Sequence, residues 1–211
     1  MAIRIAQDKE ADALLTRDPL ALLLGMLLDQ QFPMERAFAG PALIAERIGT
    51  PDRLDAAQLA DYDTEALVEV FRGPPAVHRY PGSMAERVQA VCRVIADEYD
   101  GDATNLWTTA ATGKELHARL VALPGFGDQK ARIFVALLGK QLKVRPDGWR
   151  DAAGAYGDDG SRRSVADVRD PGTLQEVRAF KQEAKAAKKA AATPAKARKT
   201  TKKTAKPRSA S

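Results

Sequence analysis

The sequence predicts an all-α fold, a compact multi-helix domain followed by a disordered basic C-terminal tail. Apolar residues recur at helical spacing through most of the first 150 positions. The connections between these segments are short and rich in Pro and Gly, as in "RGPPAVHRYPGS". Strand signals are weak throughout, which favours helices packed on helices.

Composition limits the function classes. The 211 residues are 45% hydrophobic, enough for one domain with a core. No run approaches the roughly 20 apolar residues of a membrane span, and the N-terminus has no signal-peptide pattern, so we expect a cytoplasmic protein. The single cysteine, Cys92, lies in a helical apolar pattern and is expected to be a buried thiol. We expect no metal site and no cofactor, because one cysteine and two histidines offer too few ligands.

The first predicted helix begins at Asp18-Pro19, a pair typical of an N-cap and a first helical residue. The stretch "LALLLGMLLDQQ" is apolar all round at its front, which indicates a central buried helix ending in the polar residues 29–31. Further helices are expected at 34–48, 56–60, 64–71, 83–99 and 113–122, with Asp52, Asp63 and Ser83 as caps of three of them.

The stretch "LPGFG" at 123–127 then joins two helical segments, and the second begins with Asp128, Gln129 and Lys130. Glycines permit a positive φ angle or a close approach of the backbone to another group. The free N–H groups at the start of a helix, together with its dipole, attract anions such as a nucleic-acid phosphate. Phe126 is expected to point inward. A plain turn between two helices is the alternative. The predicted backbone-binding residues are Leu123, Pro124, Gly125, Phe126, Gly127, Gln129 and Lys130.

The charge is distributed unevenly along the chain. Residues 181–211 hold nine Lys and two Arg against one Glu, a net +10, which leaves −5 on the other 180 residues. Any contact of the body with nucleic acid must therefore come from a local site. We divide the chain into a domain at 1–157, a loop and helix at 158–189, and a disordered Lys/Ala-rich tail at 190–211.

Through most of residues 18–157 the pattern resembles the helix–hairpin–helix (HhH-GPD) DNA glycosylase superfamily, which includes endonuclease III and the 3-methyladenine glycosylases. The most specific element is "LPGFGDQKA", which closely matches the family's Leu-Pro-Gly-aliphatic-Gly-x-x-x-Ala hairpin. The resemblance implies a base excision repair enzyme that binds double-stranded DNA as a monomer, in the cytoplasm with the nucleoid. It would lack the iron–sulfur cluster of endonuclease III, because the chain has one cysteine.

The resemblance also assigns chemistry to single residues. Gln129 stands where bifunctional members carry the lysine that attacks the sugar, which implies a monofunctional enzyme without lyase activity. Asp147 holds the position of the catalytic aspartate by a gapless count, although its "RPDGW" context departs from the family pattern. A carboxylate there would stabilise positive charge on the sugar and orient water. A simple helix cap is the alternative reading of Asp147, and Asp151 is the second candidate for catalysis.

An extruded base leaves a gap in the duplex that a side chain must fill. The resemblance implies Gln31 in this role. His78 and Tyr80 are candidates by residue type only, and each would serve equally well as a loop anchor. Trp149 is the candidate for stacking on the base, whereas Trp107 is expected in the core.

Two other functions remain open. The first is a non-catalytic DNA-binding protein with a basic tail that associates with the nucleoid. The second is a protein-interaction module whose hairpin is only structural.

Overall fold

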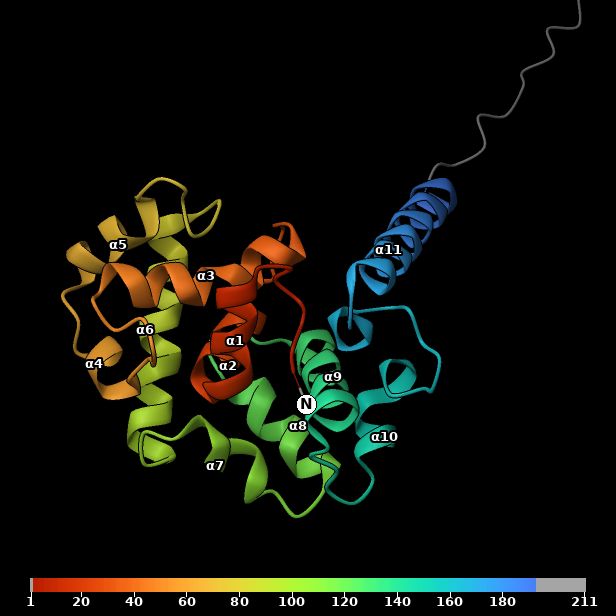
Figure 1. The fold of residues 1–211 in the computed structure, drawn as a ribbon. Coiled ribbons are helices and arrows are strands. Elements are labelled where there is room, and N and C mark those ends of the chain that lie inside the picture. The colour runs from red at the N-terminus through yellow and green to blue at the C-terminus, as the bar shows by residue number, and fades with distance from the viewer. Residues whose placement is uncertain (1, 193–211) are drawn as a thin grey trace, which may run out of the picture.

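The computed structural model describes residues 2–192, and within them the chain is built from helices without any β-strand (Figure 1). The predicted all-α class is therefore confirmed for this part of the chain. The α-helices are α1 (Lys9–Arg17), α2 (Pro19–Leu28), α3 (Met34–Arg47), α4 (Ala56–Ala60), α5 (Thr64–Arg72), α6 (Pro81–Glu98), α7 (Ala103–Thr108), α8 (Gly113–Ala122), α9 (Asp128–Leu137), α10 (Trp149–Ala153) and α11 (Pro171–Ala192). Three short elements complete the set: η1, a π-helix at Leu138–Leu142, and the 3₁₀ turns η2 (Gly154–Tyr156) and η3 (Val165–Asp167).

Helix α2 is the centre of the molecule, as its apolar sequence predicts, and each residue from Leu20 to Leu28 is buried. Asp18 caps it by accepting hydrogen bonds from the N–H groups of Leu20 and Ala21 at 2.9 and 3.1 Å. The same carboxylate accepts the Leu54 N–H at 2.7 Å. One buried side chain thus sets the start of α2 and ties it to the distant loop before α4.

Several local predictions need correction. Helix α2 ends at Leu28, so residues 29–31 come after the helix instead of closing it, and Gln31 has a positive φ of 51°. Asp52 is not a cap, since Asp55 caps α4, and Ser83 lies inside α6, which begins at Pro81. Asp63 does cap α5, as predicted. Helices α1 and α7 were not predicted.

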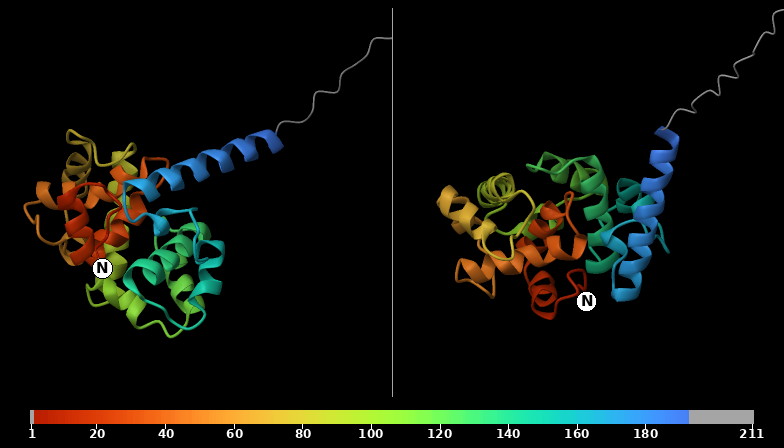
Figure 2. Two further views of the ribbon diagram at one scale, coloured as in Figure 1. Left: turned by 45° about the vertical axis from the view of Figure 1, so that its right-hand side comes forward. Right: turned by 90° about the horizontal axis from the view of Figure 1, so that it is seen from above.

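The helices form two groups on either side of α2 (Figures 1 and 2). Helices α3 to α6 pack on one side, and α8, α9 and α10 pack together on the other. Cys92 of α6 is fully buried, as expected for a structural thiol. Within residues 2–192, no helix combines the length and the apolar character needed to cross a bilayer.

Helix α11 is held to the body at its first turns and projects outward beyond them (Figure 2). Leu174 and Val177 are buried, and Arg178 forms an ion pair with Glu35 of α3. The helix continues to Ala192, so residues 190–192 of the predicted disordered tail are helical. The remaining part of that tail, 193–211, lies outside the described residues.

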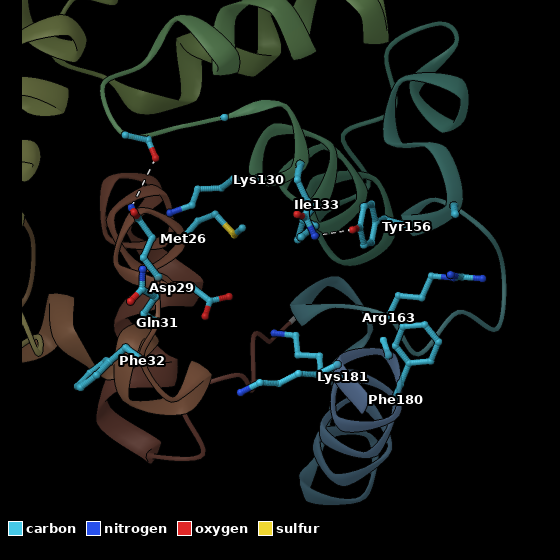
Figure 3. Close-up of a pocket in the computed structure, with 17 residues that line it drawn as sticks. Met26, Asp29, Gln31, Phe32, Lys130, Ile133, Tyr156, Arg163, Phe180 and Lys181 are labelled. Carbon is cyan, nitrogen blue, oxygen red and sulfur yellow. Dashed lines mark hydrogen bonds between the residues drawn. The ribbon is translucent and has the colours of Figure 1, made fainter. Parts of the chain in front are cut away.

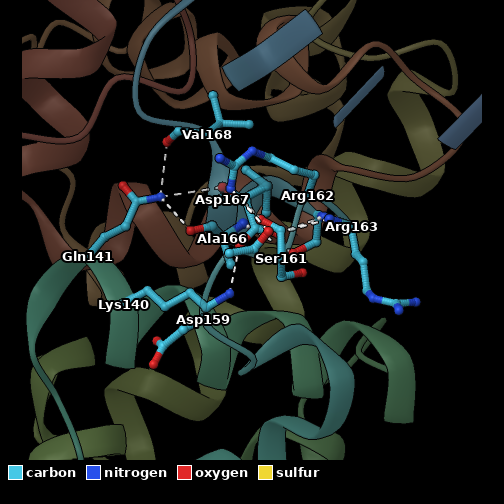
Figure 4. A network of polar contacts seen from close by, with 12 residues as sticks. Lys140, Gln141, Asp159, Ser161, Arg162, Arg163, Ala166, Asp167 and Val168 are labelled. Atoms are coloured by element: carbon cyan, nitrogen blue, oxygen red, sulfur yellow. Dashed lines mark hydrogen bonds and ion pairs between the residues drawn. The ribbon is translucent and has the colours of Figure 1, made fainter. Parts of the chain in front are cut away.

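A buried polar network fixes the segment that leads into α11 (Figure 4). The Lys140 ammonium contacts the Asp167 carboxylate at 2.6 Å, and both side chains are almost completely buried. The Gln141 amide donates to the carbonyl oxygens of Ala166 and Val168, each at 3.1 Å. These contacts connect η1 to η3 and thereby set the position of α11 against the body.

Candidate functional site

The predicted hairpin is present between α8 and α9, and its two glycines have different tasks. Gly125 has a φ of +80°, and a Cβ atom there would lie 2.9 Å from Leu27 Cδ1. This position therefore needs glycine for both backbone conformation and space. Gly127 has an ordinary φ of −110°, and a Cβ there would meet no atom within 4 Å. The absence of a side chain at Gly127 instead leaves the start of α9 open to an approaching group.

The hairpin is fastened to the end of α2. The Lys130 ammonium donates to the Leu27 carbonyl oxygen at 2.7 Å. The Gln30 amide donates to the same oxygen at 2.8 Å, and its own oxygen accepts from Arg87 of α6 at 3.0 Å. Phe126 points inward as predicted, buried and edge-on to Phe134 with ring centroids 6.3 Å apart. The hairpin is thus held rigidly against the core.

The N-terminus of α9 offers free hydrogen-bond donors. The first helical hydrogen bond of α9 is donated by the Ala131 N–H to the Gly127 carbonyl oxygen at 3.0 Å. The N–H groups of residues 128–130 therefore have no carbonyl acceptor within the helix. Asp128 adds a negative charge here, but Arg132 at 2.9 Å and His117 at 3.1 Å hold its carboxylate. Chiefly because of the Arg132 hydrogen bond, the pKa of Asp128 is lowered. The negative charge is therefore balanced on the side of α9 that faces α8.

A cleft of about 930 Å³ opens beside the hairpin, between α2, α9 and α11 (Figure 3). The end of α2 and the loop after it supply one wall, the hairpin and α9 the second, and the segment from η2 to α11 the third. The lining residues are Met26, Asp29, Gln30, Gln31, Phe32, Gly125, Gly127, Gln129, Lys130, Ile133, Ala155, Tyr156, Arg163, Phe180, Lys181, Ala184 and Lys185. Because α11 forms a wall, the cleft extends beyond the 1–157 segment.

The cleft shifts the ionisation of two groups in it. Burial raises the pKa of the Asp29 carboxyl, although the charges of Lys181 and Lys130 partly oppose this shift. Burial also lowers the pKa of Lys130 to about 8, again partly opposed by Asp29. A carboxyl and an amine with pKa values moved toward neutrality in one cleft are typical of sites of proton transfer.

Asp147 lies elsewhere, in a separate recess of about 370 Å³ that it shares with Asp151, Lys114 and His117. Its carbonyl oxygen accepts the Gly113 N–H at 2.7 Å, and its side chain is exposed. It does not cap α10, whose N-cap is Gly148 without a side-chain hydrogen bond. The structure thus brings the hairpin and Gln31 together around one cleft, and places both predicted catalytic carboxylates outside it.

The three wedge candidates differ in accessibility. Gln31 is exposed and lines the cleft, and Tyr80 is 43% exposed in the loop before α6. His78 is buried: its Nδ1 accepts the Tyr80 N–H at 3.1 Å, so its Nε2 donates to the Gln30 oxygen at 3.0 Å. Burial lowers the pKa of His78, which favours the neutral ring. This geometry is that of the loop-anchor alternative for His78.

Trp149 is also positioned for packing rather than for contact with the cleft. Its indole is buried against η1, where a Cβ on Gly139 would lie only 2.4 Å from the ring. Trp107 is in the core, edge-on to Phe134, as expected. The aromatic side chains that do line the cleft are Phe32, Tyr156 and Phe180.

Sequence reasoning missed Asp29, Tyr156 and the contribution of α11. Asp29 stands at the point where a wholly apolar helix changes to polar residues, and this abrupt change was the available signal. Tyr156 accepts the Gln129 amide N–H at 2.9 Å, a contact between residues 27 positions apart that no local pattern reveals. No protein-family model matches the chain, and neither a curated protein nor a solved structure is significantly similar to it.

Proposed function

We propose that this protein is a monofunctional DNA N-glycosylase of base excision repair, which extrudes a damaged base and hydrolyses its glycosidic bond. The observation that carries the proposal is that the hairpin and the cleft share residues. Gly125, Gly127, Gln129 and Lys130 belong to both. A backbone phosphate bound at the start of α9 therefore places its own nucleotide at the mouth of the cleft.

The properties of the cleft support an extruded base as its occupant. Its volume of about 930 Å³ falls in the range of small-molecule sites. Tyr156, Phe32 and Phe180 offer aromatic faces, on which bases stack without regard to sequence. Gln31 is exposed at the cleft and available to fill the place of the base in the duplex.

The cations around the cleft match a nucleic-acid backbone. Arg163, Lys181 and Lys185 line it together with Lys130. Lys130 and Arg163 belong to residues 1–180, which carry a net charge of −5, whereas Lys181 and Lys185 belong to the strongly basic residues 181–211. Phosphate binding by the body is thus expected at this face and not over its whole surface.

The absence of a lyase step is part of the proposal. Gln129 cannot form the imine with the sugar that strand cleavage requires, and its amide is engaged by Tyr156. Lys130 is the one lysine of the segment 123–130, and it donates to the Leu27 carbonyl oxygen. The amines that line the cleft are those of Lys130, Lys181 and Lys185.

The proposal is tested by single-turnover assays on duplexes that each carry one uracil, alkylated, oxidised or deaminated base. The expected result is alkali-labile abasic sites from at least one lesion and none from undamaged duplex. A Gly127→Asp variant, which adds a negative charge where the phosphate is proposed to bind, should lose both DNA affinity and base release.

A non-catalytic DNA-binding protein is the second candidate function. The position of Asp147 favours it, because the carboxylate that the resemblance assigns to catalysis does not line the cleft. Duplex binding that depends on the hairpin, without base release from any lesion, would support this alternative. Absence of duplex binding would exclude both functions and favour a protein-interaction module.

A further inference from the structure

Asp29 is the only carboxylate among the described residues that line the cleft. It directly follows the last residue of α2, and its carboxylate points away from that helix into the cleft (Figure 3). The charged residues facing it are Lys130 of α9, Lys181 of α11 and Glu35 of α3. Asp29 thus faces two ammonium groups and one further carboxylate, Glu35, which does not line the cleft.

The Asp29 carboxylate has no partner within residues 2–192. It takes part in no hydrogen bond and in no ion pair closer than 4.0 Å between described side chains. It is nevertheless half-buried, and burial raises its pKa. Carboxylates that only support a fold are normally paired when they leave water. A desolvated, unpaired carboxylate in a cleft is instead typical of a group that meets a ligand.

We propose that Asp29 is the catalytic carboxylate of the cleft and activates the water that attacks the sugar of an extruded nucleotide. This inference rests on the proposed glycosylase function. It replaces Asp147 in that role, because Asp147 is exposed in a different recess, between α8 and α10.

The step balances with the residues present. Water attacks C1′ of the deoxyribose while the bond from C1′ to the base nitrogen breaks, and the bonding electron pair leaves on the base. Asp29 takes one proton from the water and returns it to the departing base. The products are a sugar hydroxyl and the free base, and the Asp29 carboxylate is restored. Positive charge that develops on the sugar is stabilised by the same carboxylate.

Lys130 and Lys181 complete this arrangement electrostatically. In their ammonium forms they favour the ionised state of Asp29 and attract the phosphates that flank the sugar. The pKa of Lys130 of about 8 therefore predicts a second titration. The rate of base release should rise with pH as Asp29 ionises and fall above a pH of about 8 as Lys130 loses its charge.

The inference also predicts how stability responds to substitution. Because the folded-state pKa of Asp29 is raised, folding favours its protonated form, and its ionisation reduces stability as the pH rises through that pKa. Asp29→Asn removes this charge while keeping the side-chain shape. The variant should be at least as thermostable as the wild type at pH 7, which separates lost chemistry from lost folding.

The experiment measures single-turnover base release, duplex affinity and thermal unfolding for the wild type and four variants, Asp29→Asn, Asp29→Glu, Asp147→Asn and Asp97→Asn. Asp97 is an exposed carboxylate on α6 that does not line the cleft, so its variant is the matched control and should behave as the wild type. Asp29→Asn should lower the rate by about 100-fold to 10,000-fold, with duplex affinity retained and the rising limb of the pH profile lost. Asp29→Glu, which keeps a carboxylate, should recover part of the rate.

Three outcomes are decisive. A wild-type rate in Asp29→Asn, or loss of the rate in Asp147→Asn alone, overturns the assignment of Asp29 and leaves the glycosylase proposal intact. Loss of the rate together with a large loss of thermostability in both Asp29 variants also overturns it, because Asp29 would then serve the fold. Failure of the wild type to release any base refutes the proposed function itself, and the assignment with it.

Discussion

Replacing each hairpin glycine by alanine separates the structural role of Gly125 from the binding role proposed for Gly127. In Gly125→Ala, a side chain must adopt a φ of +80°, and its Cβ would lie 2.9 Å from Leu27 Cδ1 and 3.3 Å from Arg87 Cδ. The left-handed conformation costs about 1–2 kcal/mol, and forcing a methyl group into packed surroundings costs about 1–3 kcal/mol. Alanine also lowers the conformational entropy of the unfolded chain, which stabilises the folded state by about 0.4–1 kcal/mol.

The net expectation for Gly125→Ala is therefore a loss of about 1–5 kcal/mol in the free energy of unfolding. For a chain of this size each kcal/mol lowers Tm by about 2–4 °C, so a central loss of about 3 kcal/mol lowers Tm by about 6–12 °C. Gly127→Ala differs because its φ of −110° suits alanine and the space around it is open. The weaker N-cap costs about 0.5–1 kcal/mol, which the entropy gain of about 0.4–1 kcal/mol offsets.

Thermal unfolding by circular dichroism and duplex affinity by fluorescence anisotropy, measured on both variants, test this reasoning. Gly127→Ala should unfold at the wild-type temperature and bind duplex more weakly, since its methyl group covers the start of α9. Equal destabilisation of the two variants would refute the argument from φ angles and space. Wild-type affinity in a stable Gly127→Ala protein would show that no phosphate approaches there.

Three further predictions concern the tail, the amine of the cleft and the buried ion pair. Deleting residues 193–211, which hold five Lys and two Arg and no acidic residue, should weaken binding to random duplex. The slope of log affinity against log salt concentration should become shallower by about 0.9 per lost phosphate contact. An unchanged slope would argue that these residues serve solubility alone. Borohydride should trap no covalent adduct with abasic DNA, and an adduct that disappears in Lys130→Met would show that a lyase step exists. Lys140→Met, which leaves the Asp167 carboxylate buried without its partner, should cost about 3–5 kcal/mol in urea unfolding. The exposed control Arg72→Met should cost less than about 1 kcal/mol, and similar losses in the two variants would contradict the role given to burial.

Much of the fold could be predicted because its signals are local. Asp18-Pro19 predicts the start of α2, because Asp is a common N-cap residue and Pro a common first helical residue. The helix predicted at 113–122 coincides with α8. Helix α1 was not predicted, because charged residues interrupt its apolar pattern. In the structure Asp8 caps this helix, and its Leu14 and Leu15 are buried. Short helices such as α7 carry too few turns to show a period.

The site was less predictable because it depends on which face of a helix meets the cleft. The hairpin could be found because its glycine pattern is local in sequence, although local geometry requires glycine only at Gly125 and not at Gly127. The side on which Asp147 lies is decided by contacts between distant segments, namely the Gly113 N–H to its carbonyl oxygen. The lining by Phe180 and Lys181 depends on the docking of α11, which the Lys140–Asp167 pair controls from another part of the chain.

The π-helical turn η1 has a consequence for comparing this chain with others by residue counting. A π-turn encloses one residue more in each hydrogen-bonded ring than an α-turn does. The gapless count from Gln129 to Asp147 passes through this turn at 138–142. A deletion of one residue there would allow the turn to close as ordinary α-helix and would rotate the segment on its C-terminal side by about 100°. Two chains with equal spacing between hairpin and aspartate can therefore present that aspartate on different faces, and an alignment that places a gap at η1 would be the structurally faithful one.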